Sequence, residues 1–206
     1  MKTTLRAMTL VEVVVAIAIM LIAMEGFTLL FLRSWDTNKY ILESGMAVTT
    51  ASRVNNKIIS ELRRVRQADN GDYAIESGSD FDLIVYLDID HDGVTERVHY
   101  FLDQATDQLK KGVTEPSNTV PISYSPTDDT VTVLTNYVVN DDTMPLFTYY
   151  NKDYPGDIVN NPLPFPLSVD QVYLIRVHLY VNINPVHAPD NINIESFVNL
   201  RNLNNT

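Results

Sequence analysis

Three aspartates recur at every second position in the segment Asp88-Ile89-Asp90-His91-Asp92-Gly93. Carboxylate oxygens are the ligands that calcium prefers, and D-x-D-x-D-G is the opening of a calcium-binding loop. A complete loop has a bidentate glutamate at its twelfth position, where this chain has His99, and Glu96 could substitute only with a different geometry. The alternative is an acidic hairpin turn that binds no ion. If calcium binds, the candidate ligands are Asp88, Asp90 and Asp92.

Other residues with useful chemistry are scarce. The absence of cysteine excludes a disulfide framework, thiolate zinc ligands and a cysteine nucleophile. The sequence contains no P-loop, no G-x-G-x-x-G and no G-x-S-x-G motif. No close metal-binding spacing relates the four histidines, which are His91, His99, His178 and His187. We therefore expect neither an enzyme nor a bound cofactor, apart from calcium in the acidic loop.

The charge of the chain is negative overall and unevenly distributed. The 206 residues include 15 Lys and Arg against 26 Asp and Glu, a formal net charge of -11. This balance argues against nucleic acid as a partner, because phosphate binding needs a basic surface. Residues 33–66 carry seven basic and three acidic groups, whereas residues 69–206 carry six basic and 21 acidic groups. The contrast indicates a basic rod followed by an acidic body.

An apolar run from Met8 to Leu32 gives the sharpest signal in the sequence. As a helix it is about 37 Å long, enough to cross a bilayer core of about 30 Å with some tilt. Lys2 and Arg6 precede the run, which favours a cytoplasmic N-terminus and an extracytoplasmic body. The sequence therefore predicts a single-pass protein of the cytoplasmic, or inner, membrane.

Glu12 interrupts this apolar run. A carboxylate within a spanning helix costs roughly 2.5–3.5 kcal/mol on insertion scales and normally has a partner. No Lys, Arg or His lies within two helical turns after it, so its partner is expected to come from another chain. A secretory signal peptide would have a shorter apolar stretch with a small-residue cleavage site. A plain membrane anchor would leave Glu12 unexplained.

The stretch Leu5-Arg6-Ala7-Met8-Thr9-Leu10-Val11-Glu12 resembles the class III signal sequence of type IV pilins and type II secretion pseudopilins. Arg6 matches the basic position of that signal, and Ala7 matches the small residue before the cut. Ala7 stands where the family usually has glycine, and Met8 where it usually has phenylalanine. The resemblance implies cleavage between Ala7 and Met8 by a prepilin peptidase, followed by N-methylation of Met8.

The same resemblance assigns Glu12 to assembly, because it matches the glutamate at the fifth position of the mature family members. It implies that the carboxylate meets the terminal amine of a neighbouring pilin or pseudopilin subunit inside an apolar bundle. Pairing this buried charge would fix the axial register of the subunits. The expected partners are therefore other subunits, the prepilin peptidase and the membrane, and the expected location is a periplasmic or surface filament.

Beyond Leu32 the chain turns polar but keeps helical spacing. An apolar stripe at steps of three and four predicts that one helix continues from Met8 to about Ala68. Asp69-Asn70-Gly71-Asp72 is a stop signal. The basic residues are expected on the exposed side of this rod. The stripe consists of Ala47, Ala51, Val54, Ile58, Leu62 and Val65.

After Gly71 the apolar pattern alternates with period two, which predicts antiparallel strands. A proline-rich loop at 151–168 is expected to lie outside the core. The predicted fold class is α+β, a long transmembrane and amphipathic helix packed on an antiparallel sheet as in the pilin lollipop. The predicted strands cover residues 81–88, 96–102, 130–139, 171–184 and 192–200. The predicted parts are a leader at 1–7, a membrane or filament-core half-helix at 8–32, an amphipathic half-helix at 33–69 and a β-rich body at 70–206.

The order of elements in the body is most similar to J-type minor pseudopilins. The shared features are the hairpin around Asp88 to Gly93, Glu96 and Tyr100 after it, and a closing segment at 199–202. This resemblance implies a structural minor subunit that acts in filament assembly or tip initiation. The alternative from the residues alone is a membrane-anchored extracytoplasmic binding module with an acidic loop that could bind calcium.

Overall fold

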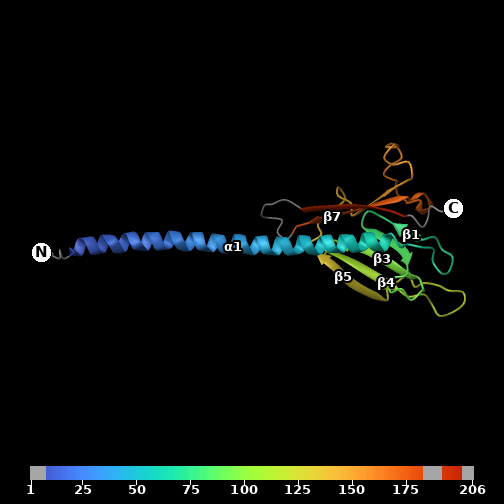
Figure 1. The fold of residues 1–206 in the computed structure, drawn as a ribbon, viewed down its shortest axis with the longest axis horizontal. Helices are drawn as coiled ribbons and strands as arrows, with labels where there is room; N and C mark the ends of the chain where they lie inside the picture. The colour runs from blue at the N-terminus through green and yellow to red at the C-terminus, as the bar shows by residue number, and fades with distance from the viewer. Residues whose placement is uncertain (1–7, 183–191, 201–206) are drawn as a thin grey trace, which may run out of the picture. The chain divides into compact units, whose positions relative to one another are not determined.

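The computed structural model describes residues 8–182 and 192–200, and the chain divides into two compact units after Ser44. The described part contains one α-helix, one short 3-10 helix and eight strands. The α-helix precedes all the strands (Figure 1). Helix α1 runs from Leu10 to Leu62, beginning in the first unit and ending in the second. The structure thus confirms an α+β chain with one long N-terminal helix followed by antiparallel sheets.

Helix α1 ends at Leu62, not near Ala68 as the apolar stripe predicted. Residues 63–64 form a turn, and the Arg66 amide then donates a hydrogen bond of 2.9 Å to the carbonyl oxygen of Tyr86. The chain therefore leaves the helix to pair with the end of a strand. Val65 and Ala68 are still buried, so the apolar residues remain in the core without being helical.

Five strands form an antiparallel sheet in sequence order. Its central strand, β3, pairs with β2 in a continuous register in which Val85 faces Val98 and Leu87 faces Glu96. This pairing makes residues 88–95, the acidic segment, the connection of a hairpin. The strands are β1 (Ile75–Gly78), β2 (Asp82–Leu87), β3 (Glu96–Asp103), β4 (Gln108–Thr114) and β5 (Thr130–Asn136).

The second sheet has three antiparallel strands with β7 in the middle. These strands are β6 (Phe147–Tyr150), β7 (Leu174–Val181) and β8 (Ile192–Asn199), and the 3-10 helix η1 (Val169–Gln171) precedes β7. The Tyr149 hydroxyl of β6 donates to the carbonyl oxygens of Ser79 and Asp82, at 3.0 and 3.1 Å. These bonds tie the second sheet to the β1–β2 edge of the first.

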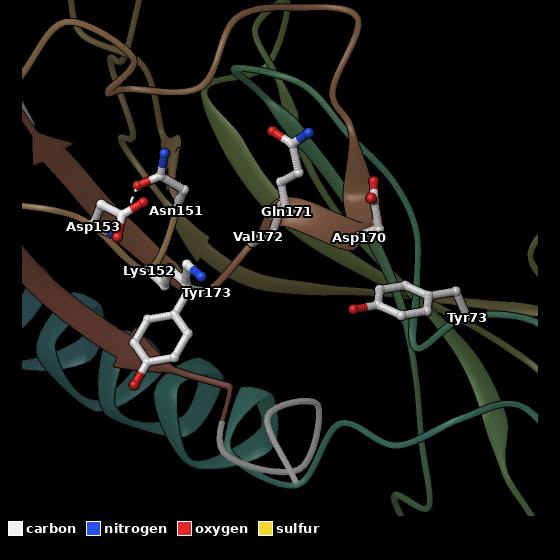
Figure 2. Close-up of a pocket in the computed structure, with 8 residues that line it drawn as sticks. All are labelled: Tyr73, Asn151, Lys152, Asp153, Asp170, Gln171, Val172 and Tyr173. Carbon is white, nitrogen blue, oxygen red and sulfur yellow. Dashed lines mark hydrogen bonds between the residues drawn. The ribbon is translucent and has the colours of Figure 1, made fainter. Parts of the chain in front are cut away.

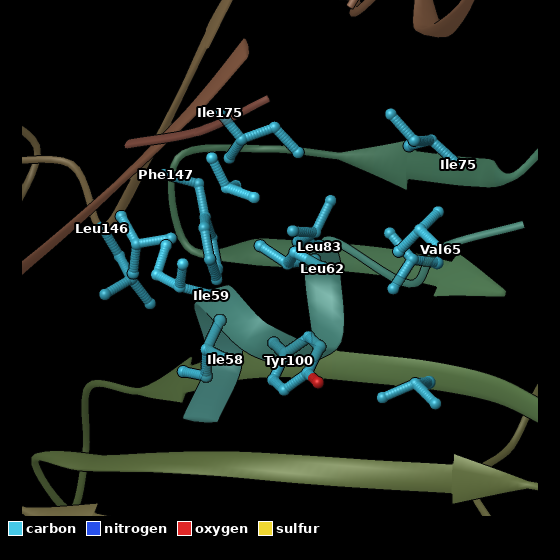
Figure 3. Close-up of a cluster of buried hydrophobic side chains, with 14 of the residues drawn as sticks. Ile58, Ile59, Leu62, Val65, Ile75, Leu83, Tyr100, Leu146, Phe147 and Ile175 are labelled. Atoms are coloured by element: carbon cyan, nitrogen blue, oxygen red, sulfur yellow. The ribbon is translucent and has the colours of Figure 1, made fainter. Parts of the chain in front are cut away.

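The last turns of α1 supply the centre of the core. Ile58 and Leu62 have no exposed surface, and they lie among side chains of both sheets, including Tyr100 and Phe147 (Figure 3). The Asn55 side-chain amide also donates a hydrogen bond of 2.7 Å to the Ser196 hydroxyl of β8. The apolar stripe predicted from the sequence is confirmed over Ala51, Val54, Ile58, Leu62 and Val65, all of which are buried.

The proline-rich loop departs from its prediction at one point. Leu163 lies in the loop but is buried in the core, and its amide donates a hydrogen bond of 2.8 Å to the carbonyl oxygen of Tyr149. The loop is therefore irregular, as expected, but part of it covers the second sheet and does not stay outside the core. Three strands were not predicted at all, namely β1, β4 and β6.

Candidate functional site

The N-terminal part of α1 exposes its apolar side chains. Every residue from 8 to 39 is solvent-exposed, including Leu10, Phe27 and Phe31 at more than half of their maximal areas. A continuous apolar surface of this kind is rare on soluble monomers and is typical of segments that contact lipid or other apolar chains. The N-terminal part of α1 is long and apolar enough to be a candidate single membrane span.

Thr9 and Glu12 form a capping box at the start of this helix. The Glu12 Oε2 atom accepts hydrogen bonds from the Thr9 amide at 2.8 Å and from the Thr9 hydroxyl at 3.0 Å. The Thr9 Oγ1 atom accepts in return from the Glu12 amide at 3.3 Å. This reciprocal arrangement satisfies amide groups that have no partner within the helix.

The capping box changes the interpretation of Glu12. We expected its partner to come from another chain, whereas Thr9 of the same chain provides a hydrogen-bond partner. No cation is paired with Glu12 among the described residues, and its second carboxylate oxygen has no hydrogen bond there. Charge pairing therefore remains to be supplied from outside the part of the chain described. Ala7, the predicted residue before the cut, lies outside the described residues, and Met8 is the first residue within them.

The acidic segment forms a compact loop held by its own aspartates. Asp88 accepts hydrogen bonds from the amides of His91, at 2.6 Å, and Gly93, at 3.2 Å. Asp90 accepts from the Asp92 amide at 3.1 Å, and Asp92 accepts from the Val94 amide at 2.8 Å. Gly93 adopts φ = 96°, a conformation that favours glycine, so the Asp-Gly turn signal is confirmed.

Glu96, the first residue of β3, joins the three aspartates. One carboxylate oxygen from each of Asp88, Asp90, Asp92 and Glu96 can be chosen so that all four atoms lie within 4.8 Å of one another. The aspartates are partly or fully exposed, whereas Glu96 is only 1% exposed. The structure therefore brings together the three predicted candidates and adds a fourth. Sequence analysis named Glu96 but did not identify it as the residue that closes the cluster.

His99, the residue at the twelfth position of the motif, has hydrogen-bond partners of its own on other parts of the chain. Its Nε2 atom lies 3.1 Å from an Asp82 oxygen, and its Nδ1 atom lies 3.0 Å from an Asp128 oxygen. Burial alone would lower the pKa of His99, but the hydrogen bonds with the two carboxylates outweigh it and raise the pKa. His99, which occupies the twelfth position of the sequence motif, therefore makes its hydrogen bonds with Asp82 and Asp128.

This arrangement predicts a pH dependence of stability. A raised histidine pKa in the folded state stabilises the protein fully below the unfolded value of about 6.5, and the contribution is lost as pH rises through the folded pKa. We expect the melting temperature of the full chain in EGTA, measured as the difference from that of His99→Gln at the same pH, to fall from pH 6 to pH 8. A difference between the two proteins that grows in the opposite direction would contradict the pairing of protonated His99 with Asp82 and Asp128.

Two arginines after the helix contact the acidic loop. Arg66 donates to the Gly93 carbonyl oxygen and to the Thr95 hydroxyl, both at 2.8 Å, and its Nη1 atom lies 3.9 Å from an Asp88 oxygen. Arg64 donates to the Asp88 carbonyl oxygen at 3.2 Å. The expectation that the basic residues lie on the exposed side of the rod is therefore wrong for these two, which attach the loop to the end of α1.

A cavity of about 370 Å³ opens between η1 and the turn after β6 (Figure 2). Burial and the nearby Asp170 carboxylate raise the pKa of Tyr73, which lines it. None of its lining residues is a serine, histidine or cysteine, so the lining contains no Ser–His or Cys–His pair. The lining residues are Tyr73, Asn151, Lys152, Asp153, Asp170, Gln171, Val172 and Tyr173.

Comparisons with known proteins add no family assignment. No family model, no curated protein and no solved structure matches this chain. The features of the chain that bear on function are the exposed apolar helix with its Thr9–Glu12 cap and the acidic loop with Glu96.

Proposed function

We propose that this protein is a structural minor pilin or pseudopilin, processed by a prepilin peptidase and assembled into a filament of the type II secretion or type IV pilus kind. In this proposal the first unit lies in the membrane before assembly and in the filament core afterwards. The second unit is the extracytoplasmic body of the pilin lollipop. The protein acts by assembling with other subunits or by initiating the filament tip, and it catalyses no reaction.

The observation that supports this proposal best is the exposed apolar helix that follows the Arg6-Ala7-Met8 sequence. Burying its surface requires lipid or neighbouring helices, and a filament subunit needs both in succession. The apolar run ends at Leu32, and Arg33 and Trp35 follow within one turn. Cationic and tryptophan side chains are typical of the boundary between lipid and water. These features suit an anchor that later packs among other helices.

Glu12 provides a reason to prefer a filament over a simple anchor. Its Oε2 atom serves the helix cap, and the other oxygen is available to an amine from a neighbouring subunit. Cleavage after Ala7 would create such an amine at Met8 of each subunit. A carboxylate and an amine that meet in an apolar bundle would specify one axial register.

A membrane-anchored binding module is the second candidate, and the acidic loop favours it. Glu96 is buried beside three aspartates, an arrangement that is costly without a bound cation. The two candidates differ in what happens to the N-terminus. A filament subunit is cut on the cytoplasmic side of its apolar helix, whereas an anchored module keeps its leader.

Processing tests the proposal directly. We expect co-expression with a prepilin peptidase to remove Met1 to Ala7 and to add one methyl group to the amine of Met8. The peptidase recognises a small residue before the cut in the family that the signal resembles. Intact-mass measurement of the purified protein, with and without the peptidase, gives the result.

Two substitutions at one position provide the control. Ala7→Gly restores the residue usual in the family and is expected to be cleaved, whereas Ala7→Leu is expected to keep the full leader. A mature protein that begins near residue 25 or later would mean ordinary signal-peptidase processing. An uncut wild-type chain beside efficient cutting of a known prepilin would favour the anchored module.

A further inference from the structure

Glu96 has a carboxylate oxygen for which the described part of the chain offers no partner. Its Oε2 atom accepts a hydrogen bond of 2.6 Å from the Ile89 amide. Its Oε1 atom is buried and has no hydrogen bond. A buried charged oxygen without a partner is strongly unfavourable, and such a group in a native structure calls for a partner that the chain does not supply.

The surroundings of Glu96 are negative. The carboxylates of Glu115 and Asp90 lie near Glu96. The only ion pair that the described residues give to any of the four clustered carboxylates is the long one of Arg66 with Asp88, at 3.9 Å. The cluster therefore has a large uncompensated negative charge.

We propose that Asp88, Asp90, Asp92 and Glu96 bind one calcium ion. Calcium takes oxygen ligands at 2.3–2.6 Å, so ligands on opposite sides of the ion lie up to about 5 Å apart. The four carboxylates can present oxygens within 4.8 Å of one another, which fits a sphere of that size. Magnesium needs a tighter octahedron at about 2.1 Å and retains several waters, which suits a set of four protein carboxylates less well.

Glu96 takes the place of the missing carboxylate at the twelfth position. It is close in sequence to the aspartates, and pairing of Leu87 with Glu96 at the base of the β2–β3 hairpin brings it back to Asp88. The Ile89 amide holds its Oε2 atom, which leaves Oε1 to bind the ion. Because Glu96 is fixed in the sheet and the three aspartates lie in the loop, a bound ion would join the loop to the body. The site does not depend on whether the protein forms filaments.

Melting of the full-length protein in detergent tests the site. After EGTA treatment, we expect millimolar calcium to raise the melting temperature by roughly 5–10 °C if its concentration is about 100 times the dissociation constant. An equal concentration of magnesium should have a much smaller effect. Equilibrium dialysis with radioactive calcium should give close to one ion per chain.

Three variants locate the ligands. Glu96→Gln and Asp90→Asn keep the shape and the backbone hydrogen bonds of the parent side chains, and both should weaken the calcium response, because a neutral amide oxygen is a poorer calcium ligand than a carboxylate. In EGTA, Glu96→Gln should melt no lower than wild type, because it removes a buried charge from a negative cluster. Asp142→Asn, a change of the same type at an exposed aspartate outside the cluster, should keep the full response.

Three results would overturn the inference. The first is the absence of calcium binding and of a melting shift in millimolar calcium. The second is a shift of wild-type size in both Glu96→Gln and Asp90→Asn, which would place the ion elsewhere. The third is an equal response to magnesium, which would contradict the assignment to calcium.

Discussion

Glu12→Gln is expected to be inserted and cleaved normally but to fail in assembly. Glutamine can still accept the two hydrogen bonds from Thr9, so the capping box at the start of α1 is retained. What it loses is the negative charge that would pair with the terminal amine of a neighbouring subunit. This substitution therefore separates the two roles that a single carboxylate can have at this position.

The expected loss is large. Removing one partner of a buried ion pair costs on the order of 3–5 kcal/mol, because the other charge remains without compensation. Every 1.4 kcal/mol is a factor of ten, so the population of assembled subunits should fall by more than 100-fold. A defect of this size should be visible as a complete loss of cross-linking between neighbouring helices.

The absence of cysteine gives the experiment a clean readout. A single Ala16→Cys substitution provides the only thiol, and a photoreactive label attached there reports contacts with adjacent apolar helices in the native membrane. Thr9→Ala is the matched control. It removes the cap at a cost of about 0.5–2 kcal/mol to the helix end but keeps the Glu12 charge, so cross-linking should persist.

The opposite pattern would contradict assembly through charge. If Glu12→Gln cross-links as wild type does while Thr9→Ala loses cross-linking, the carboxylate serves the helix end alone. The preference for a filament subunit over an anchored module would then rest on N-terminal processing only.

Parts of the fold with a strong local pattern could be predicted from the sequence. The alternating residues of β2, β3, β7 and β8 indicated strands, and the stripe from Ala51 to Leu62 indicated the face of α1 that is buried. Each depends on periodicity, which the chain shows within a few residues. The candidate membrane span was likewise evident from length and composition.

The remaining elements depend on contacts between distant residues. Strand β4 contains Lys110, Lys111 and Gly112, which resemble a loop, and the buried Lys111 pairs with Glu61 of α1. Just after the helix ends at Leu62, the Arg66 amide donates a hydrogen bond to the carbonyl oxygen of Tyr86, which is distant in sequence. No local pattern shows either contact.

The candidate sites also combine features that have a local sequence pattern with features that depend on the fold. The three aspartates are a local motif, and they could be named from the sequence. The contribution of Glu96 depends on hairpin register, which brings residue 96 opposite Leu87 beside the loop. The sequence indicated that Glu96 could substitute for the missing carboxylate only with a different geometry, and it did not show that geometry. The capping role of Glu12 could also have been recognised, because Thr9 three residues earlier completes the S/T-x-x-E pattern.

Glu61→Ala is expected to cause the largest loss of stability in the body. Glu61 is 5% exposed near the end of α1, where its two oxygens meet groups from neighbouring strands. One oxygen accepts a hydrogen bond from the Tyr100 hydroxyl of β3, and the other lies 3.2 Å from the Lys111 Nζ atom of β4. Burial raises the pKa of Tyr100, and the Glu61 carboxylate raises it further.

Truncating Glu61 leaves an ammonium and a hydroxyl buried without their partner, since Lys111 is 8% exposed and Tyr100 has no exposed surface. We expect a destabilisation of about 3–5 kcal/mol, which corresponds to a fall in melting temperature of roughly 6–20 °C. Lys57→Ala is the matched control. Its Nζ atom lies 3.9 Å from Glu61, but the side chain is 57% exposed, so its loss should cost about 0–1 kcal/mol.

A combined substitution distinguishes an uncompensated charge from lost packing. Glu61→Leu with Lys111→Met replaces both charged groups by apolar side chains and should recover much of the stability lost in Glu61→Ala, because no buried charge remains. Adding Tyr100→Phe removes the unpaired hydroxyl and should recover more. Urea unfolding of the full chain in detergent and EGTA measures all four variants. If the combined variant is no more stable than Glu61→Ala, the defect comes from packing of α1 on the sheet, and the Glu61–Lys111 pair is not what couples the helix to the body.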